Sequence, residues 1–143
     1  TRDLNVAGGD GYAGVVNVSG LLDIYGEIAN TGAYFGNDPV DGVANGTASI
    51  NVSGGTLRMT QLAPLGPNAT IDIVDGEVIL LGDQTTMVNS YISTDQILAD
   101  GGDADVLVST YDEEGQTYTR VIPEPATICL VGLGVLGFLR KRK

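Results

Sequence analysis

The chain has 143 residues, 43% of them hydrophobic, and a formal net charge of −11 at pH 7. That length leaves room for one modest domain and a short tail. The acidic charge disfavours nucleic-acid binding, because contacts to phosphate need basic side chains, and a sequence without histidine lacks the commonest general base and zinc ligand.

The body of the chain favours short β-strands joined by tight turns. Glycine accounts for 21 residues, tryptophan is absent, and valine and isoleucine recur in short alternating runs. This composition is typical of strands and turns and not of helices. We therefore expect a mainly β fold.

A short motif recurs within residues 1–83 and supports this expectation. Its copies are Asn-Val-Ser-Gly at 17–20, Asn-Val-Ser-Gly at 51–54 and the looser Ile-Val-Asp-Gly at 73–76. Residues 5–9 resemble a truncated earlier copy. Each copy lies between two alternating segments, so its final glycine is a predicted bend point, because glycine permits sharp turns. The predicted bend points are Gly20, Gly54 and Gly76.

Alternation places one set of side chains on one face of each strand. Ile50 and Val52 form one predicted inward row, and Ile71 and Ile73 form another. One such unit cannot bury its apolar face alone, whereas stacked units can, which favours a β-solenoid or β-helix-like fold. Residues 32–47 are predicted to form a loop between units. A small antiparallel sandwich is the alternative fold.

Residues 84–120 have a different pattern and are predicted to cap the open end of the stack. Apolar residues at helical spacing predict a short helix over 84–93, followed by a helical turn over 94–98 that ends at the glycine pair 101–102. Alternating residues on both sides of 112–115 predict a final hairpin. We expect such a cap because an exposed sheet edge invites aggregation.

No catalytic residues are predicted, and we expect that the chain is not an enzyme. Asp72, Asp75 and Glu77 cluster in the sequence, and carboxylate pairs serve in glycoside hydrolysis. However, Asp75 and Glu77 flank a turn glycine, so turn formation and solvation are the expected roles of these side chains.

Calcium is the predicted ligand of one acidic loop. The candidate ligands are three aspartates around a glycine pair: Asp100, Asp103 and Asp105. Hard carboxylate oxygens on a flexible loop suit calcium. A second candidate set comprises Asn37, Asp38 and Asp41. Neither set has the full pattern of an EF-hand loop, so polar turn chemistry is the alternative for both, and no other cofactor is expected.

The end of the chain has the features of a membrane segment. The uncharged run from Ala126 to Leu139 would form a helix of roughly 21 Å at about 1.5 Å per residue, against a bilayer core of about 30 Å. We expect Val121 and Ile122 to extend this span upstream. Four basic residues follow the run: Arg140, Lys141, Arg142 and Lys143.

Charge predicts the orientation of this segment. Basic residues beside a membrane segment stay cytoplasmic, and every acidic residue except Glu124 lies before residue 121. The acidic body is therefore expected outside the inner membrane and the basic end inside. A buried core helix with a basic end is the alternative. The single cysteine, Cys129, lies within the apolar run, so no internal disulfide is expected.

A short polar motif immediately precedes the apolar run: Pro123, Glu124 and Pro125. Tripeptide, apolar run and basic end together resemble the PEP-CTERM sorting signal of bacterial envelope and extracellular proteins. The resemblance implies that exosortase, an integral-membrane transpeptidase-like enzyme, recognises and processes residues 121–143, with this chain as its substrate. Each proline restricts its predecessor to extended geometry, so we expect a rigid, exposed, extended tripeptide. The strand repeats of the body resemble, more loosely, those of autotransporter passengers.

Three functional hypotheses follow. The leading one is a non-catalytic, exported structural or adhesive protein of the cell envelope or extracellular matrix, first anchored in the inner membrane, with extracellular polysaccharide as a candidate partner. The second is the C-terminal scaffold of a larger secreted polysaccharide-active enzyme, and the third is a carbohydrate-binding or calcium-binding module. Because an exported protein normally needs a signal peptide and none follows Thr1, we expect further sequence upstream.

Overall fold

The computed structural model describes residues 4–6, 13–24, 33–35, 46–62 and 65–125, and these form a mainly β structure with one short helix. The elements in chain order are β1 (Leu4–Val6), β2 (Ala13–Val18), β3 (Leu21–Ile24), β4 (Ala33–Phe35), β5 (Thr47–Met59), β6 (Asn68–Leu81), α1 (Thr85–Ile92), β7 (Ile97–Ala99), the 3-10 turn η1 (Asp100–Gly102), β8 (Val106–Glu113) and β9 (Gln116–Pro123). The prediction of a mainly β fold is confirmed.

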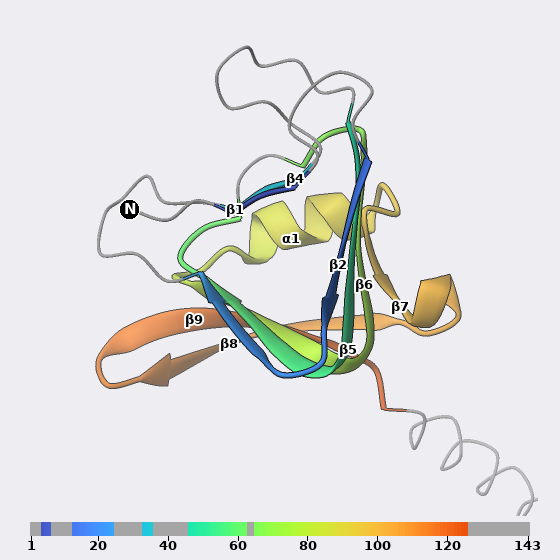
Figure 1. Ribbon diagram of the computed structural model, residues 1–143. Coiled ribbons are helices and arrows are strands. Elements are labelled where there is room, and N and C mark those ends of the chain that lie inside the picture. The colour runs from blue at the N-terminus through green and yellow to red at the C-terminus, as the bar shows by residue number, and fades with distance from the viewer. Residues whose placement is uncertain (1–3, 7–12, 25–32, 36–45, 63–64, 126–143) are drawn as a thin grey trace, which may run out of the picture.

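Three layers of parallel strands form one side of the seven-stranded main sheet. The successive strands β2 and β3 lie along β5, and β5 lies along β6, with Thr47 opposite Asn68 and Thr56 opposite Glu77. Figure 1 shows that each layer bends sharply midway and that α1 lies on the inner side of the bend. The described strands of residues 1–83 do not form the antiparallel sandwich, because they pair with one another in parallel. A solenoid remains a prediction.

Strands β1 and β4 form a separate two-stranded parallel sheet, in which Leu4 lies opposite Ala33. Residues 5–9 were expected to begin an earlier copy of the repeat, but their described part, in β1, does not join the main sheet. Ala33–Phe35 is a strand and not part of a loop, and the rest of the predicted loop lies mostly outside the described residues.

The core lies on the inner side of the bent sheet, as alternation predicted. Ile50, Val52, Ile71 and Ile73 are fully buried, which confirms both inward rows. Beyond the bend the alternation continues, and the α1 side chain of Val88 completes the same cluster. The fully buried residues of this second half include Leu57, Met59 and Leu80. Burial of each such side chain contributes about 1.5 to 3 kcal/mol.

The corner of each layer lies at a glycine. Two register shifts between β5 and β6 flank the corner, because β6 has an extra residue at Val74 and β5 has one at Gly54. A Cβ atom on Gly55 would lie 2.5 Å from the carbonyl oxygen of Gly20, and a Cβ atom on Gly76 would overlap the carbonyl oxygen of Gly55. Gly20, Gly55 and Gly76 are therefore stacked, and the prediction that Gly54 is the equivalent residue is wrong.

Helix α1 confirms the helix expected over 84–93, and its first residue, Thr85, is bound by Asp83, two positions upstream. The Asp83 Oδ1 atom accepts hydrogen bonds from the Thr85 hydroxyl (2.7 Å) and backbone N–H (3.1 Å). These bonds hold the pKa of the Asp83 carboxyl below its usual value, with the hydroxyl as the larger cause.

The helical turn expected over residues 94–98 is wrong. Asp95 has a φ of 56°, which ends the helix, and the chain continues as β7. Strand β7 pairs in parallel with β6, with Ile97 opposite Ile71, and both Ile97 and Ala99 are buried. In a segment of five residues, the spacing of the apolar side chains fits a helix as well as a strand. The backbone groups along the edge of β6 favour the strand, because they pair with β7.

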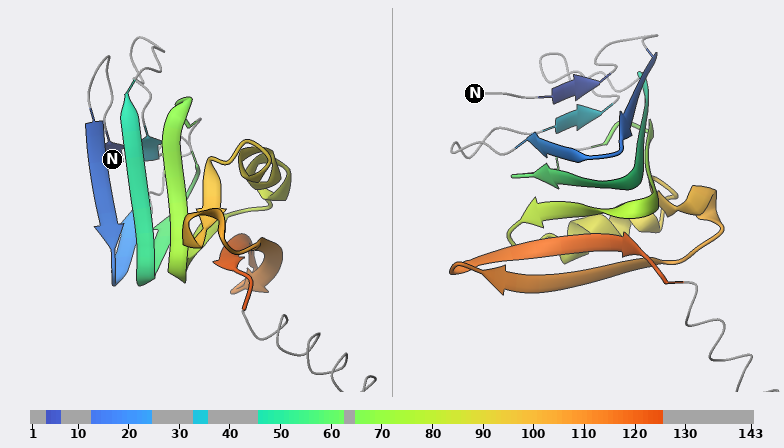
Figure 2. Two further views of the ribbon diagram at one scale, coloured as in Figure 1. Left: turned by 90° about the vertical axis from the view of Figure 1, so that its right-hand side faces the viewer. Right: turned by 60° about the horizontal axis from the view of Figure 1, so that its bottom comes forward.

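The final hairpin is confirmed. Strands β8 and β9 pair antiparallel around Glu114 and Gly115, whose φ angles of 51° and 80° fit a type I′ turn. Strand β9 also pairs antiparallel with the second half of β6, while β7 pairs with its first half. Both therefore extend the sheet on the side of β6 opposite β5, as Figure 2 shows for the orange strands.

Thr119 on β9 is the one buried polar residue among those the structure describes, and it fixes the turn before α1. Its hydroxyl donates to the Gly82 carbonyl (2.8 Å) and accepts from the Gln84 N–H (2.7 Å). We expect the substitution Thr119→Val, which keeps the shape, to reduce the free energy of unfolding by about 1 to 3 kcal/mol, because both backbone groups lose their partner.

Urea unfolding followed by circular dichroism measures this effect. Thr117→Val is the matched control on the same strand, because the exposed Thr117 hydroxyl bonds only the Asp112 carboxylate in the described contacts. The control should change the free energy of unfolding by no more than about 0.5 kcal/mol. Equal effects of the two substitutions would contradict the role given to Thr119.

Candidate functional site

The predicted tripeptide leaves the sheet at the end of β9. This strand is held on both sides near its end, because Val121 lies opposite Val78 of β6 and opposite Val108 of β8. Pro123 is the last residue of β9 and lies opposite Val106. A proline is tolerated at a strand end because it removes only one ladder donor.

The ladder continues one bond beyond the strand. The Glu124 backbone N–H donates to the Asp105 carbonyl oxygen at 2.7 Å, in the same register as the β8–β9 pairs. Pro123 and Glu124 are half-buried and Pro125 is exposed. The tripeptide is therefore extended as expected at its start, but the prediction that it is an exposed segment holds only for Pro125.

The structure also corrects the expected length of the apolar span. Val121 is 1% exposed, within the core, and Ile122 lies in the ladder opposite Leu107. Neither residue can extend a membrane helix while the sheet is formed. Residues 126–143, including the predicted basic stop at 140–143, lie outside the described residues. Among the described residues, none of the helices has the length and apolar character needed to cross a bilayer.

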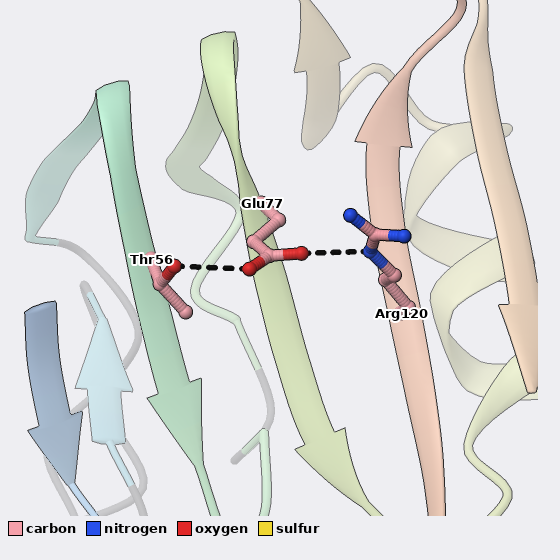
Figure 3. Close-up of polar contacts among 3 residues, drawn as sticks. All are labelled: Thr56, Glu77 and Arg120. Atoms are coloured by element: carbon pink, nitrogen blue, oxygen red, sulfur yellow. Dashed lines mark hydrogen bonds and ion pairs between the residues drawn. The ribbon is translucent and has the colours of Figure 1, made fainter. Parts of the chain in front are cut away.

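A second polar site lies at the outer corner of the sheet. An open groove of about 490 Å³ is bordered by the corner glycines and by polar side chains of three neighbouring strands. Thr56 on β5 donates to Glu77 Oε1 at 3.0 Å, and Arg120 Nε on β9 donates to Glu77 Oε2 at 2.7 Å, as Figure 3 shows. Asp75 borders the same groove.

These contacts tie β5, β6 and β9 together. Arg120 and Glu77 are 47% and 24% exposed, so their ion pair is expected to contribute at most about 1 kcal/mol. The arrangement sets the register of β9 on β6 more than it provides a reactive group, since Glu77 already accepts two hydrogen bonds. No local sequence pattern indicates this trio, because Arg120 lies 43 residues after Glu77.

An aromatic cluster extends the same outer face. The Arg58 Nη2 atom donates to the Tyr118 hydroxyl at 3.2 Å, and its guanidinium carbon lies 5.2 Å from the ring centroid of Tyr118. Tyr111 stacks on Tyr118 with 5.4 Å between ring centroids. Burial, and next the negative charge of Glu113, raise the pKa of Tyr111. This cluster packs the hairpin against β5, and no sequence pattern indicated it.

The three aspartates predicted to bind calcium lie in and after η1. Asp100 and Gly101 have φ angles of 49° and 66°, and the Asp103 N–H donates to the Asp100 carbonyl oxygen at 3.1 Å. Asp105 uses its own carbonyl to hold Glu124. Within the described part of the chain, no three acidic, histidine or cysteine side chains are placed to hold a metal ion. The structure thus shows polar turn contacts at these aspartates. The second candidate set, at 37, 38 and 41, lies outside the described residues.

Comparison with known families identifies the tail. The family model of the PEP-CTERM protein-sorting motif matches residues 121–143. No curated protein and no solved structure matches the chain. The motif is a substrate signal for exosortase, a membrane processing enzyme, and implies an exported, envelope-associated protein. The resemblance of the body to autotransporter passengers remains a prediction.

Proposed function

We propose that this chain is a non-catalytic structural or adhesive protein of the cell envelope or extracellular matrix, which exosortase processes at its C-terminal signal. The observation that carries the proposal is the sorting motif over residues 121–143, which begins within the last strand of the folded body. Because the signal is continuous with the sheet, the whole sheet is carried to the membrane site where the signal is processed.

The membrane part of the proposal is supported by sequence. The uncharged run at 126–139 and the basic residues at 140–143 form a short membrane helix with its end in the cytoplasm, and the acidic body lies outside. Because Val121 and Ile122 belong to the sheet, the remaining apolar run is shorter than a helix that crosses the hydrocarbon core of a bilayer. A short helix suits a temporary hold before processing better than a permanent anchor.

The body serves as the scaffold of this protein. Stacked, bent parallel strands with glycines at the corner support a β-solenoid, with residues 84–120 as its cap. The non-catalytic role is supported by the absence of histidine from the sequence and by the structural use of the described polar groups. Glu77, Arg120 and Thr119, for example, all hold strands or turns together.

The test is to express the chain behind an export signal in bacteria that contain or lack exosortase. Without the enzyme we expect the full chain in the membrane fraction. With the enzyme we expect a shorter product released from that fraction. A chain that ends at Pro125 keeps every described element and should be soluble in both hosts. Glu124→Ala, which retains the backbone donor, is the matched control and should stay unprocessed in the membrane fraction. Equal partitioning of the full and truncated chains would refute the proposal.

A further inference from the structure

The sorting tripeptide has a single backbone donor. Proline has no backbone N–H, so in Pro123-Glu124-Pro125 only Glu124 can donate from its main chain. That N–H is directed at the Asp105 carbonyl oxygen, 2.7 Å away. The one main-chain donor of the signal is therefore already used by the folded body.

The residues just before Glu124 are held in the same way. Pro123 lies opposite Val106 and Ile122 lies opposite Leu107, so the first residues of β8 run along one edge of the signal. Ile122, Pro123 and Glu124 are all half-buried. Strand β8 thus occupies the backbone edge that carries the donor.

An enzyme that reads an extended peptide commonly adds it as a strand, so that main-chain hydrogen bonds supply affinity. The carbonyl group of Asp105, directly before β8, already accepts a bond of this kind from the one donor of the tripeptide. We propose that residues 105–107 are a built-in cover of the sorting signal, and that exosortase binds the tripeptide only after this end of the β8–β9 ladder has opened. The inference rests on the proposed function, because it concerns the same processing step.

Opening of this end is physically accessible. Ladder ends open locally at much lower free energy than the whole structure. The cover therefore slows processing and links its rate to the local stability of the hairpin, while a fully unfolded body would expose the signal at once.

A reversible cross-link tests the cover. Leu107→Cys with Ile122→Cys joins residues that lie directly opposite each other, whose Cα atoms in an antiparallel ladder are about 4.5 to 5.5 Å apart, within disulfide range. Glu113→Cys with Gln116→Cys is the matched control at the turn end of the same ladder. Cys129→Ser is included in every variant to prevent mispairing. Mass spectrometry verifies each cross-link before the assay.

The full chain with each pair is incubated with membranes that contain exosortase. The oxidised 107–122 pair should be processed at least about tenfold more slowly than its reduced form, because it prevents the local opening. The oxidised control pair should differ from its reduced form by less than about twofold, because the tripeptide end stays free to open. Equal rates for the oxidised and reduced 107–122 pair would overturn the cover and leave the proposed function intact. Failure of the unmodified chain to be processed would overturn both.

Amide hydrogen exchange tests the cover without the enzyme. The Glu124 amide of the full chain should exchange at least about tenfold more slowly than that of a variant with Gly-Ser-Gly-Ser inserted between Ile122 and Pro123. The same insertion should accelerate processing. Exchange of Glu124 at the same rate in both chains would overturn the cover.

Discussion

The substitution Gly76→Ala is expected to destabilise the body by about 3 kcal/mol or more, which is at the upper end for an added methyl group in a packed site. The new Cβ atom would overlap the Gly55 carbonyl oxygen and lie 2.8 Å from Cγ1 of Val52. The first obstacle is backbone, which cannot swing aside like the end of a long side chain. Relief requires the β5 and β6 layers to separate at the corner, next to the two register shifts between these strands.

Gly20→Ala is the matched control for this prediction. A Cβ atom on Gly20 would meet no described atom within 4 Å, and its φ is not in the left-handed region. We expect this change to stabilise the protein by about 0.4 to 1 kcal/mol, because alanine restricts the unfolded chain. Urea unfolding of the full chain in mild detergent measures both variants. Similar losses for Gly20→Ala and Gly76→Ala would show that the corner stack is not the cause.

The substitution Leu57→Ala is expected to lower the free energy of unfolding by about 2 to 5 kcal/mol, because it leaves a cavity in the core. Leu57 is 0% exposed and lies between Leu22 and Val78 in the stacked layers. Rigid neighbours on both sides limit how far the site can collapse, so the cost should fall in the upper half of that range.

Leu21→Ala provides a control with the same chemistry in the next layer. Leu21 lies on β3 but faces outward and is 71% exposed. Its loss should change the free energy of unfolding by no more than about 0.5 kcal/mol. Thermal unfolding of the pair is sufficient to compare them, and a larger loss for Leu21→Ala would mean that its face is covered by another part of the chain.

Much of the body could be predicted from its two-residue period. Ile50, Val52, Ile71 and Ile73 followed directly from alternation, because one face of each strand has to be buried. A corner formed by glycine was predicted correctly, but the position of the stacked glycine in β5 was not. The motif ends at Gly54, yet the stacked glycine is Gly55, because spacing in the sequence does not show where a bulge adds a residue.

The segment after α1 shows why a local sequence pattern is not sufficient to distinguish a helix from a strand. Residues 94–98 were expected to be helical, and they form a turn followed by β7. The deciding factor is the edge of β6, which offers ladder groups to Ile97 and Ala99, and such a partner is invisible in a short window of sequence. The Arg58–Tyr118 contact was missed for a similar reason, since its residues are 60 positions apart.

The position of the candidate site could be predicted from the sequence, but its contacts with the folded body could not. The order of tripeptide, apolar run and basic end was sufficient to find the sorting motif at 121–143. The attachment of Glu124 to Asp105 could not be predicted, because the sequence does not fix which residues of a hairpin lie opposite each other until the turn is known. The turn at Glu114 and Gly115 sets that register.

The continuation of the β8–β9 ladder into the tripeptide also has a mechanical consequence. A force that pulls the end of the chain away from β8 acts first on the bond between Glu124 and Asp105 and then on the pair of Ile122 and Leu107. The remaining β8–β9 pairs would then break one at a time, from the tripeptide towards the turn. A strand that is pulled along its length would instead lose all its pairs together. Tension on the tail would therefore extend the sorting segment at low force, while the stacked layers of β5 and β6 remain intact.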